Sequence, residues 1–284
     1  MTRWVTETLH PEMHTAYRCD RVLYETRTEQ QHLVLFENAL FGRMLALDGI
    51  IQVTGRDEFI YHEMMTHVPL LAHGRARRVL VIGGGDGGVA REVLRHRTVE
   101  RVVMVEIDES VVTFSRQYLP EISAGAFDDP RLDLVIDDGA DFVARTTERF
   151  DVIIVDSTDP VGPGAVLFSD DFYGHAASRL ADGGVIVTQN GVPFLQGDEL
   201  VSTMTSFRAR FRVATCFIAT IPTYVGGPMA MGFGTTDPGL LEVGEAELRA
   251  RFAAAGLRTR YYSPAVHKGA FALPGYIERL VRPD

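Results

Sequence analysis

Cysteine is scarce in this chain, with only Cys19 and Cys216 among 284 residues and no C-x-x-C pair. Neither a disulfide framework nor a zinc site is supported, so we expect no metal and a reducing compartment. Lys and Arg form no run and the net charge is −10, which argues against nucleic acid and is compatible with a small cationic substrate. No apolar signal region and no run of roughly 18 apolar residues occurs, so we expect a cytoplasmic protein without membrane contact.

Strand-like segments fill residues 1–55. They are rich in aliphatic and aromatic residues, cover 17–28, 32–37 and 43–53, and are separated by turn formers at 29–30, 38 and 48–49. This pattern predicts a small antiparallel β domain. Such a sheet has too little core to be stable alone, so we expect it to pack on the rest of the chain and on another subunit.

Residues 56–284 alternate between strand-like and helix-like segments. A helix is expected from Asp57, and strands are expected at 78–82, 101–107, 132–136, 151–155 and 184–189. Two more strands are expected at 212–221 and 229–235, and a helix at 245–255. The β-α-β repetition predicts an α/β fold with a Rossmann-like parallel sheet, joined by right-handed crossovers.

The segment V-L-V-I-G-G-G-D-G-G at 79–88 reads as a buried strand, a tight turn and a helix start. Gly83, Gly85 and Gly88 fit the G-x-G-x-x-G pattern of dinucleotide sites. Asp86 argues against a dinucleotide, because its carboxylate would repel a pyrophosphate and compete for the same N–H groups. The loop therefore suits a cationic ligand better.

Acidic residues follow the carboxyl ends of most predicted strands, where ligands bind in open parallel sheets. These acids are Glu106, Asp108, Asp137, Asp138, Asp156 and Asp159. No basic residue accompanies them at the strand ends in the sequence. Taken singly, each could be a helix cap or a turn former, and Asp108 is the clearest cap. Taken together, they predict a site for metal ions or ammonium groups.

Glu106 lies 23 residues after Gly83, the separation at which nucleotide-binding folds place an acid on ribose hydroxyls. Asp138 and Gly139, at the next strand end, would then face an adenine. Nucleoside recognition without phosphate recognition fits S-adenosyl compounds, which also carry a sulfonium. The loop D-S-T-D-P-V-G-P at 156–163 is either an Asx-turn or a lid that closes over substrates.

An ordered set of motifs resembles spermidine synthase: L-D-G-I-I-Q-V-T at 47–54, D-E-F-I-Y-H-E-M-M at 57–65, G-G-G-D-G-G at 83–88, V-E-I-D at 105–108, D-D-G at 137–139, D-S-T-D-P-V-G-P at 156–163 and I-P-T-Y at 221–224. The resemblance implies transfer of an aminopropyl group from decarboxylated S-adenosylmethionine, a co-substrate, to putrescine. Spermidine and methylthioadenosine would result, with no cofactor. It also implies an N-terminal β domain on a Rossmann-like domain, in a homodimer or homotetramer.

The resemblance also assigns roles to individual positions. Nucleoside or donor contacts fall on Gln31, Asp86, Glu106, Asp138, Gly139 and Pro163. Amine contacts fall on His62, Asp86, Asp156, Ser157, Thr158, Asp159, Gln189 and Tyr224. Asp156 would accept the amine proton, with Tyr61 beside it as the second catalytic residue. Gly55 and Ala165-Val166 depart from the family pattern, which leaves the lid and the amine preference open.

The chemistry gives these residues a purpose. A diamine with pKa values of ~10 must lose a proton to a carboxylate of pKa ~4, and desolvation of Asp156 would narrow the difference between the two pKa values. Asp86 would attract the ammonium tail of the decarboxylated donor and repel the carboxylate of its parent compound. His62 would bond the far ammonium of the diamine, which requires a neutral imidazole.

Three other classes compete with this interpretation. A methyltransferase would share the sheet, the glycine loop and Glu106, but it would leave Asp86, Asp156 and Asp159 without an electrostatic purpose. A non-catalytic polyamine-binding protein would explain the acids but not the nucleoside contacts. A nicotinamide dehydrogenase is disfavoured by Asp86.

Overall fold

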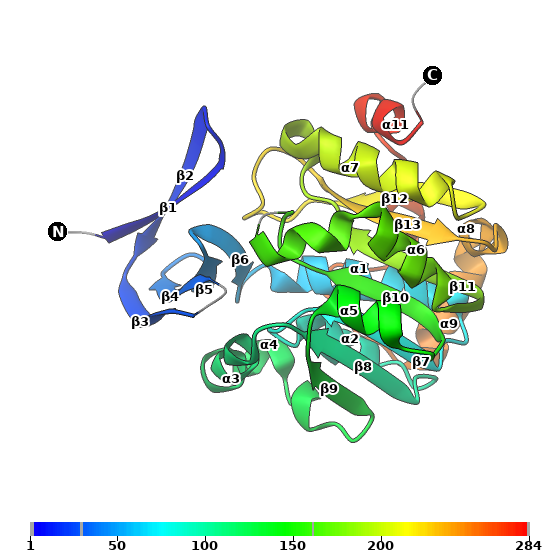
Figure 1. The fold of residues 1–284 in the computed structure, drawn as a ribbon, viewed down its shortest axis with the longest axis horizontal. Helices are drawn as coiled ribbons and strands as arrows, with labels where there is room; N and C mark the ends of the chain where they lie inside the picture. The colour runs from blue at the N-terminus through cyan, green and yellow to red at the C-terminus, as the bar shows by residue number, and fades with distance from the viewer. Residues whose placement is uncertain (1–2, 29–30, 161, 283–284) are drawn as a thin grey trace.

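The computed structural model describes residues 3–28, 31–160 and 162–282. The N-terminal strands, blue in Figure 1, lie to one side of a larger α/β body. An antiparallel hairpin is formed by β1 (Arg3–His10) and β2 (Met13–Cys19). A four-stranded antiparallel sheet follows in chain order: β3 (Arg21–Arg27), β4 (His32–Asn38), β5 (Gly42–Leu47) and β6 (Ile50–Thr54). The predicted antiparallel β domain is confirmed.

Two details of that prediction were wrong. Strand β1 was not expected, because its buried face alternates an apolar Val5 with a charged Glu7 and so carries a weak hydrophobic signal. The expected strand at 17–28 is divided at Asp20, whose carboxylate accepts a hydrogen bond from the backbone N–H of Ala39 at 2.8 Å. The chain turns there and begins the second sheet.

The main sheet has the order β12-β13-β11-β10-β7-β8-β9. Its strands are β7 (Arg78–Gly83), β8 (Arg101–Glu106), β9 (Leu132–Ile136), β10 (Phe150–Asp156), β11 (Leu180–Gln189), β12 (Val213–Ala219) and β13 (Met229–Thr235). Strands β7 to β11 pair in parallel, as predicted, whereas β13 runs antiparallel to both β11 and β12.

Helices cover both faces of this sheet (Figure 1). The α-helices of the described ranges are α1 (Glu58–His73), α2 (Gly88–Leu94), α3 (Glu109–Tyr118), α4 (Pro120–Ser123), α5 (Gly139–Arg145), α6 (Asp170–Ser178), α7 (Pro193–Arg208), α8 (Gly239–Glu242), α9 (Glu245–Ala255), α10 (Pro264–Ala270) and α11 (Gly275–Val281). Alternate residues of β7 enter opposite cores: Val79 and Val81 pack with α1, α2 and α9, while Leu80 and Ile82 pack with α5, α6 and α7. Both faces of the parallel strands are therefore covered by helices and buried, as is usual for parallel sheets.

The N-terminal sheet packs on the main body through α3 and α4. Leu35 and Leu45 share an apolar cluster with Phe114 and Ile122. A polar link adds to this, because the hydroxyl of Tyr17 on β2 donates a hydrogen bond of 3.1 Å to the backbone oxygen of Thr223. The sheet thereby covers the carboxyl edge of the parallel strands. Within the described residues, no helix is long and apolar enough to cross a membrane.

Candidate active site

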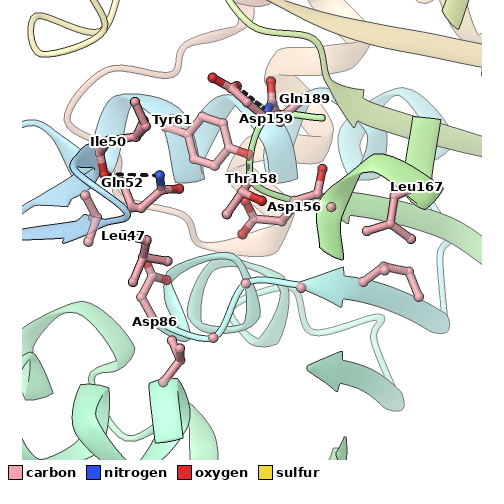
Figure 2. Close-up of a pocket in the computed structure, with 18 of the residues that line it drawn as sticks. Leu47, Ile50, Gln52, Tyr61, Asp86, Asp156, Thr158, Asp159, Leu167 and Gln189 are labelled. Carbon is pink, nitrogen blue, oxygen red and sulfur yellow. Dashed lines mark hydrogen bonds between the residues drawn. The ribbon is translucent and has the colours of Figure 1, made fainter. Parts of the chain in front are cut away.

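A pocket lies at the carboxyl edge of the parallel strands, beneath the N-terminal sheet (Figure 2). Strand β7 lies between β10 and β8, so chain connections diverge at this position, where open sheets bind ligands. The pocket is lined by thirteen of the fourteen predicted site residues: Gln31, Tyr61, His62, Asp86, Glu106, Asp138, Gly139, Asp156, Ser157, Thr158, Asp159, Gln189 and Tyr224. The side chain of Pro163 lies outside the described part of the chain.

Asp156 ends β10 and faces Tyr61 of α1 across the pocket (Figure 2). The Tyr61 hydroxyl donates a hydrogen bond of 2.6 Å to Asp156 Oδ1. Burial, followed by the charge of Asp86, raises the pKa of Asp156 to about 6. A carboxylate with this raised pKa is a better match for an amine proton than an exposed one.

The glycine loop lies directly against Asp156. Gly83 is paired with Asp156 in the sheet and has a φ of +80°, and a Cβ there would lie 2.1 Å from the Asp156 carbonyl oxygen. The next residue, Gly84, donates its N–H to the same oxygen at 3.0 Å. Glycine at 83 is therefore required for the close approach of the two strand ends.

His62 lies between two carboxylates, which overturns the prediction that it is neutral. Its Nδ1 is 2.6 Å from Glu58 Oε2 and its Nε2 is 3.4 Å from Asp86 Oδ2. Burial opposes the charge, but Asp86 and then Glu58 raise the pKa of His62 to about 10. The ring is an imidazolium at neutral pH, so both nitrogens donate and neither can accept from an ammonium.

The expectation that no basic residue accompanies the acids was also wrong. Asp86 pairs with His62, and Asp137 forms an ion pair with Arg145 of α5. These partners come from other elements, so the strand ends alone do not reveal them. Among the described residues, Asp137 is the one strand-end acid with an ion-pair partner. Asp108 and Asp138 cap helices, so Glu106, Asp156 and Asp159 retain the character of a cation site.

The end of the pocket near β8 and β9 suits a nucleoside. Glu106 is buried and accepts the N–H of Asp108 at 3.0 Å. Burial, followed by the charge of Asp108, raises the pKa of Glu106 to about 7. Asp108 caps α3 through Ser110, as predicted, and its second oxygen lies 3.3 Å from Gln31 Nε2. Apolar side chains complete this end: Leu47, Ile82, Val105, Ile107, Val111 and Leu167.

Asp138 has a structural task besides the predicted one. Its Oδ1 accepts the N–H groups of Ala140 and Asp141, at 2.7 and 3.2 Å, as the N-cap of α5. The residue also lines the pocket beside Gly139. Contact with an adenine stays a prediction.

The other end of the pocket, near β10 and β11, carries polar groups. Asp159 accepts a hydrogen bond of 3.1 Å from Gln189 Nε2 (Figure 2). The Tyr224 hydroxyl donates to the backbone oxygen of Gln52. The buried hydroxyl of Ser157 has no hydrogen-bond partner in the described ranges. An unpaired hydroxyl and an unneutralised carboxylate can both bind an ammonium.

Three polar residues of the described pocket lining were missed by the sequence analysis: Glu7, Gln52 and Gln196. Glu7 is 2 % exposed, and its carboxylate accepts the N–H of Ile51 and the hydroxyl of Thr15, both at 2.9 Å. The two-residue alternation with Val5 could have placed Glu7 on an inward face. No local signal exists for Gln196, which reaches the pocket from α7.

Comparisons with known proteins agree with this geometry. Residues 58–241 match the spermine/spermidine synthase domain, and residues 3–55 match the spermidine synthase tetramerisation domain. The chain is 61% identical over 277 residues to a polyamine aminopropyltransferase of Ruegeria sp., with 98% of both chains covered. It is 56% identical over 271 residues to polyamine aminopropyltransferase 1 of Pseudomonas aeruginosa, with 95% of both covered.

Solved structures show the same likeness. A spermidine synthase in complex with the transition state analogue AdoDATO is 33% identical, with a TM-score of 0.93, covering 99% of this chain and 96% of that one. Spermidine synthase from Thermotoga maritima is 32% identical, with a TM-score of 0.90, covering 99% and 95%. The fold, the site and these likenesses define a transferase. The chain belongs to the spermine/spermidine synthase family and is an enzyme of the polyamine aminopropyltransferase class.

Proposed function

We propose that the protein transfers the aminopropyl group of decarboxylated S-adenosylmethionine to putrescine, giving spermidine and methylthioadenosine. The Asp156–Tyr61 pair carries this proposal. It lies between the end of the pocket that contains Glu106 and the polar end that contains Asp159. A spermidine synthase with the same fold binds the transition state analogue AdoDATO, which supports the proposed reaction.

The reaction needs a neutral amine in line with the donor's S–C bond. Asp156 takes a proton from the reacting ammonium, with Tyr61 holding its carboxylate in place. The amine lone pair attacks the methylene carbon bonded to sulfur, the new C–N bond forms, and the S–C electron pair returns to sulfur. The leaving thioether is neutral, so positioning contributes more than acid catalysis. The secondary ammonium keeps the charge.

Donor choice depends on the Asp86–His62 pair. Because His62 is cationic, the pair is close to neutral rather than anionic. We propose that the donor ammonium binds the Asp86 oxygens and that the ring of His62 keeps that carboxylate ionised. No metal or other cofactor is included in this reaction, and undiminished turnover in EDTA is the expected result.

Product analysis tests this function. The enzyme is incubated with putrescine and either S-adenosylmethionine or its decarboxylated form, and the polyamine mass is measured. An added aminopropyl group supports the proposal, whereas an added methyl group or unchanged putrescine refutes it. Asp156→Asn should lower kcat about 100-fold or more, the usual contribution of a general base. Asp182→Asn, at an exposed position on β11, is the matched control and should retain activity.

We further propose that the protein is a homodimer or homotetramer assembled through residues 3–55. The match of that segment to a tetramerisation domain supports this. Light scattering on the intact chain would measure the mass, and a monomer at micromolar concentration would contradict the proposal.

A further inference from the structure

Asp159, at the polar end of the pocket, accepts hydrogen bonds from two amide side chains. Gln189 Nε2 donates to Oδ1 at 3.1 Å, and Gln196 Nε2 donates to Oδ2 at 3.0 Å. Each carboxylate oxygen therefore has its own donor. Because both donors are uncharged, they fix the direction of the carboxylate without cancelling its negative charge.

The orientation of the Gln196 amide is itself determined by its surroundings. Its Oε1 accepts the backbone N–H of Val192 at 2.9 Å, which requires the amide nitrogen to face Asp159. A Cβ on Gly191 would lie 2.5 Å from that oxygen, so the amide packs closely against the backbone. The backbone at Gln196 departs from helical geometry inside α7, with φ −124° and ψ 36°.

The amide nitrogen of Gln196 also donates a second hydrogen bond, to Glu199. Gln196 Nε2 lies 3.2 Å from Glu199 Oε1, one turn further along α7. The other oxygen, Glu199 Oε2, is buried without a hydrogen-bond partner in the part of the chain that the structure describes. Gln196 thus bridges a fixed helix and a carboxylate of the loop that follows β10.

We propose that Gln196 is a positioning residue for the acceptor, which aims Asp159 at the ammonium of the diamine that does not react. This role rests on the proposed function. Without Gln196, Asp159 would keep only the Gln189 bond, and its carboxylate could rotate away from the pocket. The acceptor would then bind more weakly, while the donor, at the opposite end, would bind as before.

Steady-state kinetics with Gln196→Met test this role. Methionine has a similar length and no donor, so the KM for putrescine should rise roughly ten-fold or more, as expected for a lost hydrogen bond to a charged group. The KM for the donor should change less than about two-fold. Asp198→Asn, at an exposed neighbouring position on α7, is the matched control and should change neither constant.

A monoamine separates positioning from general damage. With butylamine, which lacks the second ammonium, Gln196→Met should react like the wild type. In an Asp159→Asn background the substitution should add little, because the residue acts through Asp159. Equal losses with butylamine, or full additivity with Asp159→Asn, would overturn the inference.

Two further results keep the test decisive. If Gln196→Met does not fold, Gln196→Asn replaces it, because its shorter amide cannot reach Asp159 but retains polarity. If the wild type forms no spermidine, the proposed function fails. If the wild type forms spermidine and both Gln196 variants keep the wild-type KM for putrescine, only the inference about Gln196 fails.

Discussion

The charge on His62 predicts how the stability of the fold changes with pH. The imidazolium is enclosed by Glu58 and Asp86, and its side chain is only 3% exposed. We expect His62→Gln to remove this charge and leave two carboxylates facing a neutral amide. The free energy of unfolding should fall, and its dependence on pH should change.

The size of the His62 contribution to the free energy of unfolding follows from the change in its pKa on folding. Folding raises the pKa of His62 from 6.5 to about 10, and each pH unit corresponds to about 1.4 kcal/mol. A group whose pKa is higher in the folded state stabilises the fold, and this effect is complete when the pH is below the pKa of the unfolded state. The contribution of His62 to the free energy of unfolding therefore reaches about 5 kcal/mol at low pH. It is lost as the pH rises from 6.5 to 10. Between pH 6 and pH 9 the loss is about 3 kcal/mol.

Urea unfolding at a fixed protein concentration would measure this contribution. The free energy of unfolding is determined at pH 6 and pH 9 for the wild type, for His62→Gln and for a control, His175→Gln, which lies exposed on α6. From pH 6 to pH 9, the free energy of unfolding of the wild type and of the control should fall by about 3 kcal/mol more than that of His62→Gln. An equal loss in His62→Gln would show that His62 is neutral in the fold, and the argument from its two carboxylate neighbours would be refuted.

Two further predictions concern the nucleoside end and the glycine loop. Ribose hydroxyls favour an ionised Glu106, whose pKa is raised to about 7, so methylthioadenosine should bind more weakly as the pH falls from 7 to 5 and release protons on binding. Calorimetry in two buffers measures this, and Glu106→Gln with an unchanged pH dependence would contradict it. Gly83→Ala should abolish folding or activity, because its Cβ would lie 2.1 Å from the Asp156 oxygen. Gly42 also has a positive φ, of +75°, but an added Cβ there would meet no atom within 4 Å. Gly42→Ala is therefore the control, and thermal unfolding should show a loss of only about 1–2 kcal/mol in the free energy of unfolding.

The sequence by itself determined the alternation of strands and helices, the glycine turn and the acids that follow the strands. These features depend on local periodicity and turn chemistry, which short segments carry without reference to the rest of the chain. The cap formed by Asp108 was predictable for the same reason. The resemblance of the ordered motifs to one family then assigned fourteen site residues, of which thirteen line one pocket.

Only the tertiary structure decided the charge of His62 and the partners of Asp159. The Glu58–His62 spacing is visible in the sequence, but Asp86 comes from another element, and it is the nearby pair of carboxylates that raises the pKa. Gln196 likewise reaches Asp159 from α7, 37 positions along the chain. Charge states and side-chain orientation depend on distances between elements remote in sequence, and folding alone sets those distances.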